Sequence, residues 1–350
     1  MLKKKDKYNV AIMGATGAVG SEFLSILEER NFPIKELKLL ASERSKGKNL
    51  KFKKKNYPVE VLTHKSFKGI DIVLASAGAS RSLEFLPSAV KAGAVCVDNS
   101  SAFRMKDDVP LVVPEVNPDE TYSHKGIIAN PNCSTIQAVV ALGPLHKQAK
   151  IKRVVASTYQ SVSGAGQKHI LELEKQVETI EKTVDNWIVG HHSVDKFLIK
   201  QFPHQIAFNL IPQIDVFMEN AYTKEEMKLV HETRKIMGDP SMRITCTSIR
   251  VPVFFAHSES INIETEKKLS ADDARKILSK APGIRVIDDP AKQKYPMPLN
   301  AEGKNEVFVG RIREDESVEN GLNLWVVSDN LRKGAALNTI QIAELLIKHA

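Results

Sequence analysis

A turn of three evenly spaced glycines near the N-terminus constrains the fold more than any other feature of the sequence. Gly14, Gly17 and Gly20 directly follow a short apolar run at 8–13, and residues 21–30 continue with helical spacing. A strand, a glycine turn and a helix in this order are typical of a dinucleotide-binding βαβ unit, in which the turn approaches a phosphate closely. A tight turn that only packs the helix on the strand is the alternative interpretation.

The first 130 residues continue this alternation. We expect strands at 34–41, 71–75 and 94–97, and a helix at 81–91. Strands that alternate with helices predict an α/β Rossmann-type domain with a doubly wound parallel sheet.

The pattern changes after about residue 130. Long strand-like runs follow one another with few helices between them, which predicts an α+β domain with a mostly antiparallel sheet. The expected strands are 152–160, 244–253, 260–265, 307–312 and 322–327, and the expected helices are 167–184, 223–237 and 334–349. We expect the last of these helices to return to the first domain.

Length and charge agree with two soluble domains. The chain has 350 residues, of which 42% are hydrophobic and 26% are charged, as in ordinary globular proteins. Its net charge of +8 arises in residues 1–55, and the remainder is balanced. This basic cluster has no aromatic platform or recognised motif beside it, so we expect no nucleic-acid partner.

The sequence also bears on compartment. No stretch approaches 18 uninterrupted apolar residues, and the basic start at 1–10 lacks an apolar core. We therefore expect no membrane span, no signal peptide and a cytoplasmic protein. Three cysteines form no disulfide framework, so each is judged as a thiol.

The end of the second expected strand bears on which dinucleotide binds. Ser42, Arg44 and Ser45 could donate to the 2′-phosphate of NADP, whereas Glu43 could hold the ribose of NAD. A solvated basic loop is a third interpretation. Lys46 and Lys48 are expected to add only a general positive field that attracts an anionic cofactor. The lysines at 51 and 53–55 are expected on a solvated edge strand or hairpin.

Cys133 lies at the start of an expected helix, after Asn130-Pro131-Asn132. Helix N-termini favour the thiolate and can hold an oxyanion. From position alone, a core thiol and a nucleophile are equally good interpretations. Cys96 and Cys246 lie in apolar strand patterns and are expected in the core. The pair His191-His192 lacks partners at metal-ligand spacing, so no metal site is expected.

Several segments in consistent order extend this interpretation along nearly the whole chain. They are GATGAVG (14–20), SSAFR (100–104), VPEVN (113–117), NPNCST (130–135), TYQSVSGAG (158–166), KEEMK (224–228), RVPVFFAHS (250–258) and KGAALNTIQIAE (333–344). Together they resemble the microbial aspartate-β-semialdehyde dehydrogenases. The resemblance departs at Ala77-Gly78-Ala79-Ser80, where a second glycine is common, and at Ser161, where a small apolar residue is usual.

The resemblance implies the NADPH-dependent reduction of β-aspartyl phosphate to aspartate-β-semialdehyde and phosphate. This reaction serves the biosynthesis of lysine or diaminopimelate, methionine and threonine. The family is usually homodimeric and sometimes tetrameric. Its fold implies a dinucleotide-binding domain at 1–132 plus 330–350, and a catalytic and dimerisation domain at 133–329.

Matching motif positions implies the following residue roles. Cys133 would be the nucleophile, His257 the acid/base and Gln160 an orienting group. The substrate would be bound by Arg250 at its carboxylate, Glu225 at its amino group, and Arg104 and Lys228 at phosphate, with Asn132 beside the cysteine. The cofactor would contact Gly14, Thr16, Gly17, Ala18, Val19, Gly20, Ser42, Arg44, Ser45 and Gln341.

Three alternatives stay open at this stage. An N-acetylglutamyl-phosphate reductase shares the glycine turn and the cysteine at a helix start, but its substrate lacks a free ammonium for Glu225. A catalytically silent relative would be expected to lack Cys133 or His257, and both are present. Without the resemblance, Glu225 and Lys228 would be interpreted as a surface pair spaced i,i+3 on a helix.

Overall fold

The computed structural model describes residues 2–183 and 192–348. The chain divides into two compact units, which we call the first unit (Met1–Pro144, His231–Pro240 and Leu331–Ala350) and the second unit (Leu145–Val230 and Ser241–Asn330). This division differs from the expected boundaries at 133–144 and 231–240. The reason is that two continuous helices, α3 (Cys133–Ala149) and α5 (Lys224–Met237), each contribute residues to both units.

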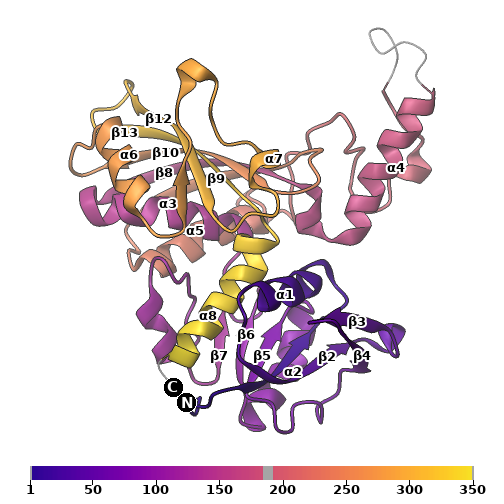
Figure 1. Ribbon diagram of the computed structural model, residues 1–350. Helices are drawn as coiled ribbons and strands as arrows, with labels where there is room; N and C mark the ends of the chain where they lie inside the picture. The colour runs from indigo at the N-terminus through magenta and orange to yellow at the C-terminus, as the bar shows by residue number, and fades with distance from the viewer. Residues whose placement is uncertain (1, 184–191, 349–350) are drawn as a thin grey trace. The chain divides into compact units, whose positions relative to one another are not determined.

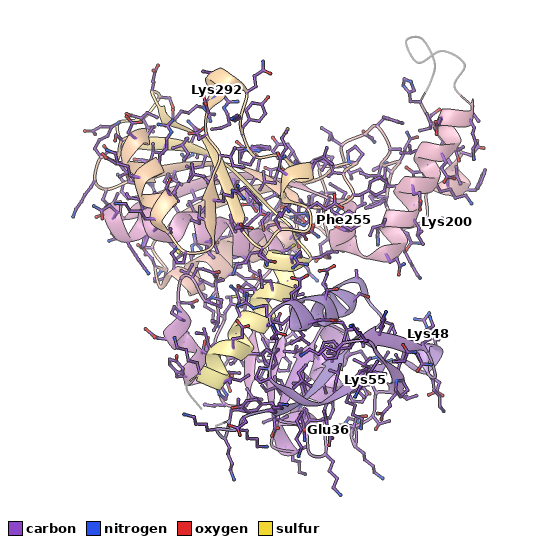
Figure 2. All side chains as sticks on the ribbon, in the orientation of Figure 1. Glu36, Lys48, Lys55, Lys200, Phe255 and Lys292 are labelled. Carbon is purple, nitrogen blue, oxygen red and sulfur yellow. The ribbon has the colours of Figure 1, made fainter. Side chains whose placement is uncertain are left out.

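The first unit contains a seven-stranded sheet in the order β3-β4-β2-β1-β5-β6-β7 (Figure 1). Its strands are β1 (Tyr8–Met13), β2 (Ile34–Ala41), β3 (Asn49–Phe52), β4 (Lys55–Val61), β5 (Ile72–Ala75), β6 (Val95–Asp98) and β7 (Ile127–Ala129). All neighbours are parallel except β3 and β4, which form an antiparallel hairpin at the edge. The predicted Rossmann-type sheet is confirmed, and so is the lysine-rich edge hairpin, where Lys55 is exposed; Lys48, just before the hairpin, is exposed too (Figure 2).

Three helices pack with this sheet: α1 (Ala18–Glu29), α2 (Ala79–Lys91) and α8 (Leu337–Lys348). The helix expected at 21–30 begins earlier, because Gly17 adopts an extended conformation and serves as the N-cap of α1. The helix expected at 334–349 begins with a π-helical turn at Arg332–Ala336, and His349 lies outside the described residues. The apolar side of α8 shares one core with β1 and α1.

The second unit contains a six-stranded sheet in the order β11-β12-β13-β10-β8-β9. Its strands are β8 (Ile151–Gln160), β9 (Arg243–Arg250), β10 (His257–Thr265), β11 (Ile284–Val286), β12 (Val307–Asp315) and β13 (Gly321–Ser328). The pairs β8–β10, β10–β13 and β12–β13 are antiparallel, and the pairs β8–β9 and β11–β12 are parallel. The mostly antiparallel sheet is therefore confirmed.

The helices that belong wholly to the second unit are α4 (Gln167–Thr183), α6 (Ala271–Lys280) and α7 (Pro298–Ala301). The helix expected at 167–184 is thus observed, with Val184 outside the described residues. The helix expected at 223–237 is α5, whose start is fixed by a capping box: Thr223 N–H donates to Glu226 Oε2 (2.7 Å), and Glu226 N–H donates to Thr223 Oγ1 (3.3 Å). Within 2–183 and 192–348, no helix has the length and hydropathy needed to cross a bilayer.

Candidate active site

The three glycines of the turn after β1 differ in how much space a side chain would have. Gly14 has φ +92°, and a Cβ there would lie 2.4 Å from the carbonyl oxygen of Ser76. A Cβ on Gly20 would lie 2.4 Å from the carbonyl oxygen of Gly14. Gly17 is exposed and would meet only that same carbonyl, at 3.4 Å. Gly14 and Gly20 are therefore required for packing, while Gly17 leaves the start of α1 accessible to a ligand.

A cavity of about 490 Å³ lies at this turn. Its lining joins the turn to the end of β2, and it includes Gly14, Thr16, Gly17, Ser42, Glu43, Arg44, Ser76, Ala77 and Arg81. Ser45 contacts Thr16 through their hydroxyls (3.2 Å), whereas Ala18, Val19 and Gly20 lie in the first turn of α1 and outside the lining. Arg81 adds a second guanidinium that sequence analysis missed, because it follows β5 and has no motif of its own.

Gln341 lies on α8 and does not line this cavity. Its Oε1 accepts from Lys333 Nζ (2.7 Å), and its Nε2 donates to Glu115 Oε1 (3.3 Å). The Lys333 ammonium is fully buried and lies 2.6 and 2.7 Å from the two Glu115 carboxylate oxygens. Burial lowers the pKa of Lys333 and Glu115 opposes that shift. Gln341 is thus part of a buried ion-pair network at the chain's last helix.

The three cysteines differ in burial, and the predicted core positions of Cys96 and Cys246 are confirmed. Cys133 is partly exposed and is the first residue of α3, where Asn132 Oδ1 accepts from the backbone N–H of Ser134 (3.1 Å). Cys96 and Cys246 are buried in β6 and β9. Burial raises the pKa of Cys96 and raises that of Cys246 to about 12, so both are core thiols that stay protonated.

Arg104 is buried in the first unit beside the segment that precedes Cys133. Its guanidinium donates to the backbone carbonyls of Asn130 (2.9 Å) and Asn99 (3.0 Å) and to Glu232 Oε1 (3.1 Å). The other Glu232 oxygen accepts from the backbone N–H of Asn132 (2.6 Å). Glu232 is 1% exposed. This carboxylate therefore joins the candidate phosphate-binding arginine to the residue before the candidate nucleophile.

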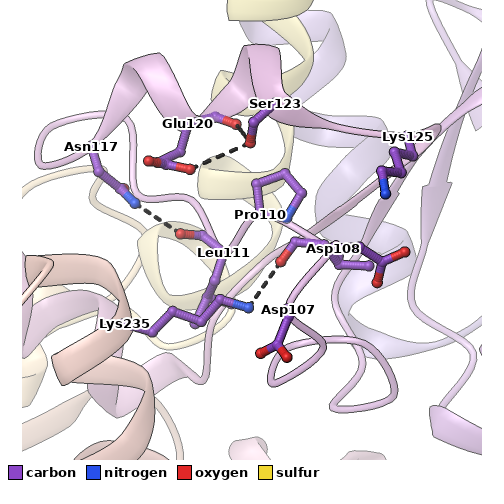
Figure 3. Close-up of a pocket in the computed structure, with 10 residues that line it drawn as sticks. Asp107, Asp108, Pro110, Leu111, Asn117, Glu120, Ser123, Lys125 and Lys235 are labelled. Atoms are coloured by element: carbon purple, nitrogen blue, oxygen red, sulfur yellow. Dashed lines mark hydrogen bonds between the residues drawn. The ribbon is translucent and has the colours of Figure 1, made fainter. Parts of the chain in front are cut away.

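Glu232 could not be recognised as a site residue from the sequence, because nothing near it in the chain indicates burial. Three residues later on α5, Lys235 Nζ donates to the carbonyls of Arg104 (2.8 Å), Lys106 (2.7 Å) and Val109 (2.9 Å). Lys235 also lines a cavity of about 480 Å³ with acidic and basic side chains (Figure 3). Because its ammonium is bonded to three carbonyls, Lys235 fixes the loop that carries Arg104.

In the second unit, His257 is fully buried at the start of β10. The strand expected at 244–253 ends earlier, at Arg250, and the strand expected at 260–265 begins earlier, at His257. Its Nδ1 lies 3.1 Å from the backbone N of Ser161 and 3.0 Å from Ser161 Oγ. Its Nε2 has no hydrogen-bond partner among the described residues. Burial, and then Arg250, lower the pKa of His257 to about 3, while Glu225 and the Ala256 backbone oppose this.

The other candidate residues of the second unit lie in the same region. Gln160 ends β8 and donates to Glu225 Oε1 (3.3 Å). Arg250 donates to the Ser161 carbonyl (2.7 Å). A Cβ on Gly164, in the turn Val162–Ala165, would lie 3.0 Å from His257 Nε2 and 3.3 Å from Arg250 Nη1. A glycine at this position therefore keeps the space beside the imidazole and the guanidinium open.

Lys228 and Glu225 form an ion pair spaced i,i+3 on α5. Without the family resemblance, this pair would have been interpreted as a surface feature of the helix. Lys228 Nζ lies 2.9 Å from Glu225 Oε2 and 3.1 Å from Asp215 Oδ2. Burial alone would lower the pKa of Lys228, but Glu225 and Asp215 raise it above its ordinary value. Glu225 is 6% exposed and also accepts from Gln160, whereas the Lys228 side chain is 26% exposed, so the pair links a buried carboxylate to a partly exposed ammonium.

No metal site was expected, and no group of three or more potential metal-ligating His, Cys, Asp or Glu side chains occurs in residues 2–183 and 192–348. His191 lies outside those ranges.

Comparisons with known proteins agree with both units. Residues 9–124 match the family model "Semialdehyde dehydrogenase, NAD binding domain", and residues 142–333 match "Semialdehyde dehydrogenase, dimerisation domain". Aspartate-semialdehyde dehydrogenase of Aquifex aeolicus is 58% identical over 97% of this chain and 98% of the relative. The Legionella pneumophila enzyme is 52% identical over 97% of this chain and 95% of the relative.

Solved structures give the same assignment. Aspartate semialdehyde dehydrogenase II of Vibrio cholerae, complexed with ASA, has a TM-score of 0.92 and 46% identity over 98% of this chain and 99% of that chain. The Candida albicans enzyme with NADP has a TM-score of 0.72 and 26% identity over 97% of this chain and 98% of that chain. The chain belongs to the aspartate-semialdehyde dehydrogenase family and is an oxidoreductase enzyme of that family.

Proposed function

We propose that the enzyme converts L-aspartyl-4-phosphate to L-aspartate-4-semialdehyde and phosphate with NADPH, through a thioester on Cys133. The observation that carries this proposal is the position of Cys133. It is the partly exposed thiol at the first residue of α3, whereas Cys96 and Cys246 are buried thiols with raised pKa values. The complex of the Vibrio relative with ASA supports the substrate class.

The nucleophilic step needs a thiolate and a leaving phosphate. The Cys133 sulfur attacks the acyl carbon, and the bond to the phosphate oxygen breaks, so a thioester remains on the enzyme. Backbone N–H groups at the start of α3 would stabilise the oxyanion that forms during attack. Arg104, fixed by Glu232, and Lys228 would attract the departing phosphate. Asn132 would hold the backbone directly before the nucleophile.

The second half of the reaction forms the aldehyde. NADPH, when bound, supplies the hydride that the thioester carbon accepts. His257, through its free Nε2, would hold or remove the proton on the oxygen of the resulting thiohemiacetal, which collapses to the aldehyde and the Cys133 thiolate. Gln160, which ends β8 and is hydrogen-bonded to Glu225, would orient the reacting group.

Substrate selectivity would come from the charged cluster of the second unit. Arg250 presents a planar guanidinium, which can bind the α-carboxylate through two parallel hydrogen bonds. Glu225 would pair with the substrate ammonium. N-acetylglutamyl phosphate lacks that ammonium, so a buried carboxylate at this position opposes its binding.

The residues of the glycine-turn cavity fit a dinucleotide with a 2′-phosphate. Gly17 leaves the start of α1 open to a pyrophosphate, and Ser42 and Arg44 line the same cavity at the end of β2. Arg81 adds positive charge there. We therefore propose NADP rather than NAD, in line with the Candida relative. The role of Gln341 toward the cofactor would require release of its bonds to Lys333 and Glu115.

We further propose that the enzyme acts as a homodimer, with a tetramer as the alternative state. The matched "dimerisation domain" supports self-association. Its product would enter the routes to lysine or diaminopimelate, methionine and threonine.

An assay in the phosphorylating direction tests the proposal. Aspartate-β-semialdehyde, phosphate and NADP should together produce NADPH continuously, and omission of any one should abolish steady-state turnover; without phosphate, at most one NADPH per active site should form. Cys133→Ala should lower turnover by at least about three orders of magnitude while NADPH affinity stays within about twofold. A variant that retained most of its turnover would exclude the covalent route.

A further inference from the structure

The π-helical turn at the start of the last helix brings two polar side chains together. In this turn, Arg332–Ala336, the backbone N–H of Ala336 donates to the Leu331 carbonyl (2.9 Å), so the bond spans five residues. Residues five apart in a regular α-helix point about 140° away from each other. Here Lys333 Nζ donates to Asn338 Oδ1 (3.0 Å) across that interval. The wider turn therefore allows an ammonium to contact an amide of the same helix.

The neighbours of Asn338 fix the orientation of its amide from both sides. The Lys333 ammonium, whose charge is paired with Glu115, can only donate, so it faces the amide oxygen. On the other side, Asn338 Nδ2 donates to the Val112 carbonyl (3.0 Å), which can only accept. The same Nδ2 donates to Asn130 Oδ1 (2.8 Å). Lys333, Asn338 and Asn130 are fully buried, so water does not compete for these bonds.

Asn130 is held at its side chain and at its backbone. Its Oδ1 accepts from Asn338, and its Nδ2 donates to Asn99 Oδ1 (2.6 Å). Its backbone N–H donates to the Asp98 carbonyl (2.8 Å), and its own carbonyl accepts from Arg104 Nε (2.9 Å). All of these residues belong to the first unit. Asn338 therefore orients the same residue that contacts the candidate phosphate-binding arginine.

Asn130 begins the short segment 130–132 that leads directly into α3 and Cys133. The far end of this segment is held by Glu232, which accepts from the backbone N–H of Asn132. A thiolate at a helix start is stabilised by the free N–H groups and the dipole of the first turn, so the stabilisation depends on where the sulfur lies. A small displacement of the segment would therefore change both the reactivity and the direction of the nucleophile.

We propose that Asn338 is a positioning residue for the nucleophile: it connects Asn130 to the Lys333–Glu115 ion pair and thereby holds the start of α3 where Cys133 can react. This inference rests on the proposed role of Cys133 as the nucleophile. The last helix is a suitable anchor, because its apolar side shares one core with β1 and α1.

The experiment compares three variants of the full-length enzyme. Asn338→Leu, which branches at the same carbon, removes every hydrogen bond of the amide. Asn338→Asp keeps the size and the acceptor for Lys333 but has no N–H for Asn130, and it covers the case in which leucine disturbs folding. Thr339→Val is the matched control, because it removes a neighbouring buried hydroxyl whose bond goes to the Ala335 carbonyl of the same chain segment (2.9 Å).

The first measurement is the reactivity of each thiol in the absence of substrates. The enzyme is treated with iodoacetamide near neutral pH, and peptide mass spectrometry follows the three cysteines separately. In both Asn338 variants the alkylation rate of Cys133 should fall by about three- to tenfold, while the buried Cys96 and Cys246 should stay slow. General loosening of the fold would instead raise the alkylation rates of the buried thiols. Thr339→Val should react like the unsubstituted enzyme.

The second measurement separates turnover from cofactor binding. In the phosphorylating direction, both Asn338 variants should lower kcat by about tenfold, because the nucleophile is misplaced. The KM for NADP should stay within about twofold, because neither Asn338 nor Asn130 lines the glycine-turn cavity. Thr339→Val should change neither quantity.

Three results would overturn this role for Asn338. They are an unchanged Cys133 alkylation rate in both Asn338 variants, faster alkylation of all three cysteines, and an equal loss of reactivity in Thr339→Val. Failure of the proposed function is a separate outcome. If Cys133→Ala retained turnover, the assignment of the nucleophile would fall, while the alkylation measurement, which needs no turnover, would still report on Asn338.

Discussion

The cavity at the glycine turn and the surroundings of His257 are built in opposite ways. The cavity is formed largely by short stretches of chain around residues 14–17 and 41–44, and Arg44 beside it is exposed. His257 is fully buried, and its neighbours Ser161 and Asn330 are 96 and 73 positions away. A dinucleotide needs an accessible cationic surface, whereas a proton-transfer group needs a dry environment in which a few fixed partners set its charge.

His257→Gln should produce the largest effect. That effect should be limited to catalysis and should leave cofactor binding unchanged. Loss of the acid/base should lower kcat by about 10²–10⁴-fold, because general acid–base catalysis contributes that much. NADP affinity depends on the other region and should stay within about twofold. Steady-state kinetics and fluorescence titration with NADPH measure the two quantities. A comparable loss of NADP affinity would show that the two regions are not functionally separate.

Glu232→Gln tests the first unit, where a buried charge is paired. The variant leaves the buried Arg104 guanidinium without its carboxylate, which should lower the free energy of unfolding by about 3–5 kcal/mol. It should also raise the KM for phosphate more than the KM for semialdehyde, because Arg104 loses its charged partner and keeps only its bonds to the carbonyls of Asn99 and Asn130. Urea unfolding and initial rates measure both.

Glu174→Gln is the matched control for that experiment, because it removes the same charge from an exposed position on α4. It should change stability by no more than about 0.5 kcal/mol. Equal destabilisation by the two substitutions would show that Glu232 stabilises the fold no more than an exposed glutamate does.

Arg44→Ala should produce the smallest effect, and only the affinity for NADP should change. Loss of one hydrogen bond to a charged group in a solvent-accessible site should weaken NADP binding about tenfold and leave NAD binding unchanged. Lys48→Ala, at an exposed position just before β3 and outside the cavity, should weaken both only slightly. Equal losses for NAD and NADP would exclude contact between Arg44 and the 2′-phosphate.

The same comparison explains which features were predictable from the sequence. Local hydrophobic periodicity and the positions of glycine and proline predict four features correctly. They are the βαβ start, the parallel sheet, the mostly antiparallel sheet and the position of Cys133 at a helix start. The glycine turn and the end of β2, both expected to contact the cofactor, line one cavity because parallel strands place their carboxyl ends at one edge of a sheet.

The residues that sequence reasoning missed are defined by distant partners. Glu232 has the local signature of a surface helix residue, and only the fold places Arg104 and Asn132 against it. Ser161 was noticed only as a departure from a family pattern, because its contacts with His257 and Asn330 form when separate strands pair. Gln341 shows the converse. Its motif implies a cofactor contact, but in this structure its amide is bonded to a buried ion pair.

The central claim is that Cys133 forms a covalent acyl intermediate. Its most direct test is intact-protein and peptide mass spectrometry of enzyme mixed with aspartate-β-semialdehyde and NADP without phosphate, then quenched in acid. Oxidation to the thioester can proceed, but phosphate is absent and cannot release the acyl group. An aspartyl adduct is expected on the peptide that contains Cys133, and it should disappear when phosphate is added before the quench. NADPH formation with no adduct on that peptide would contradict it.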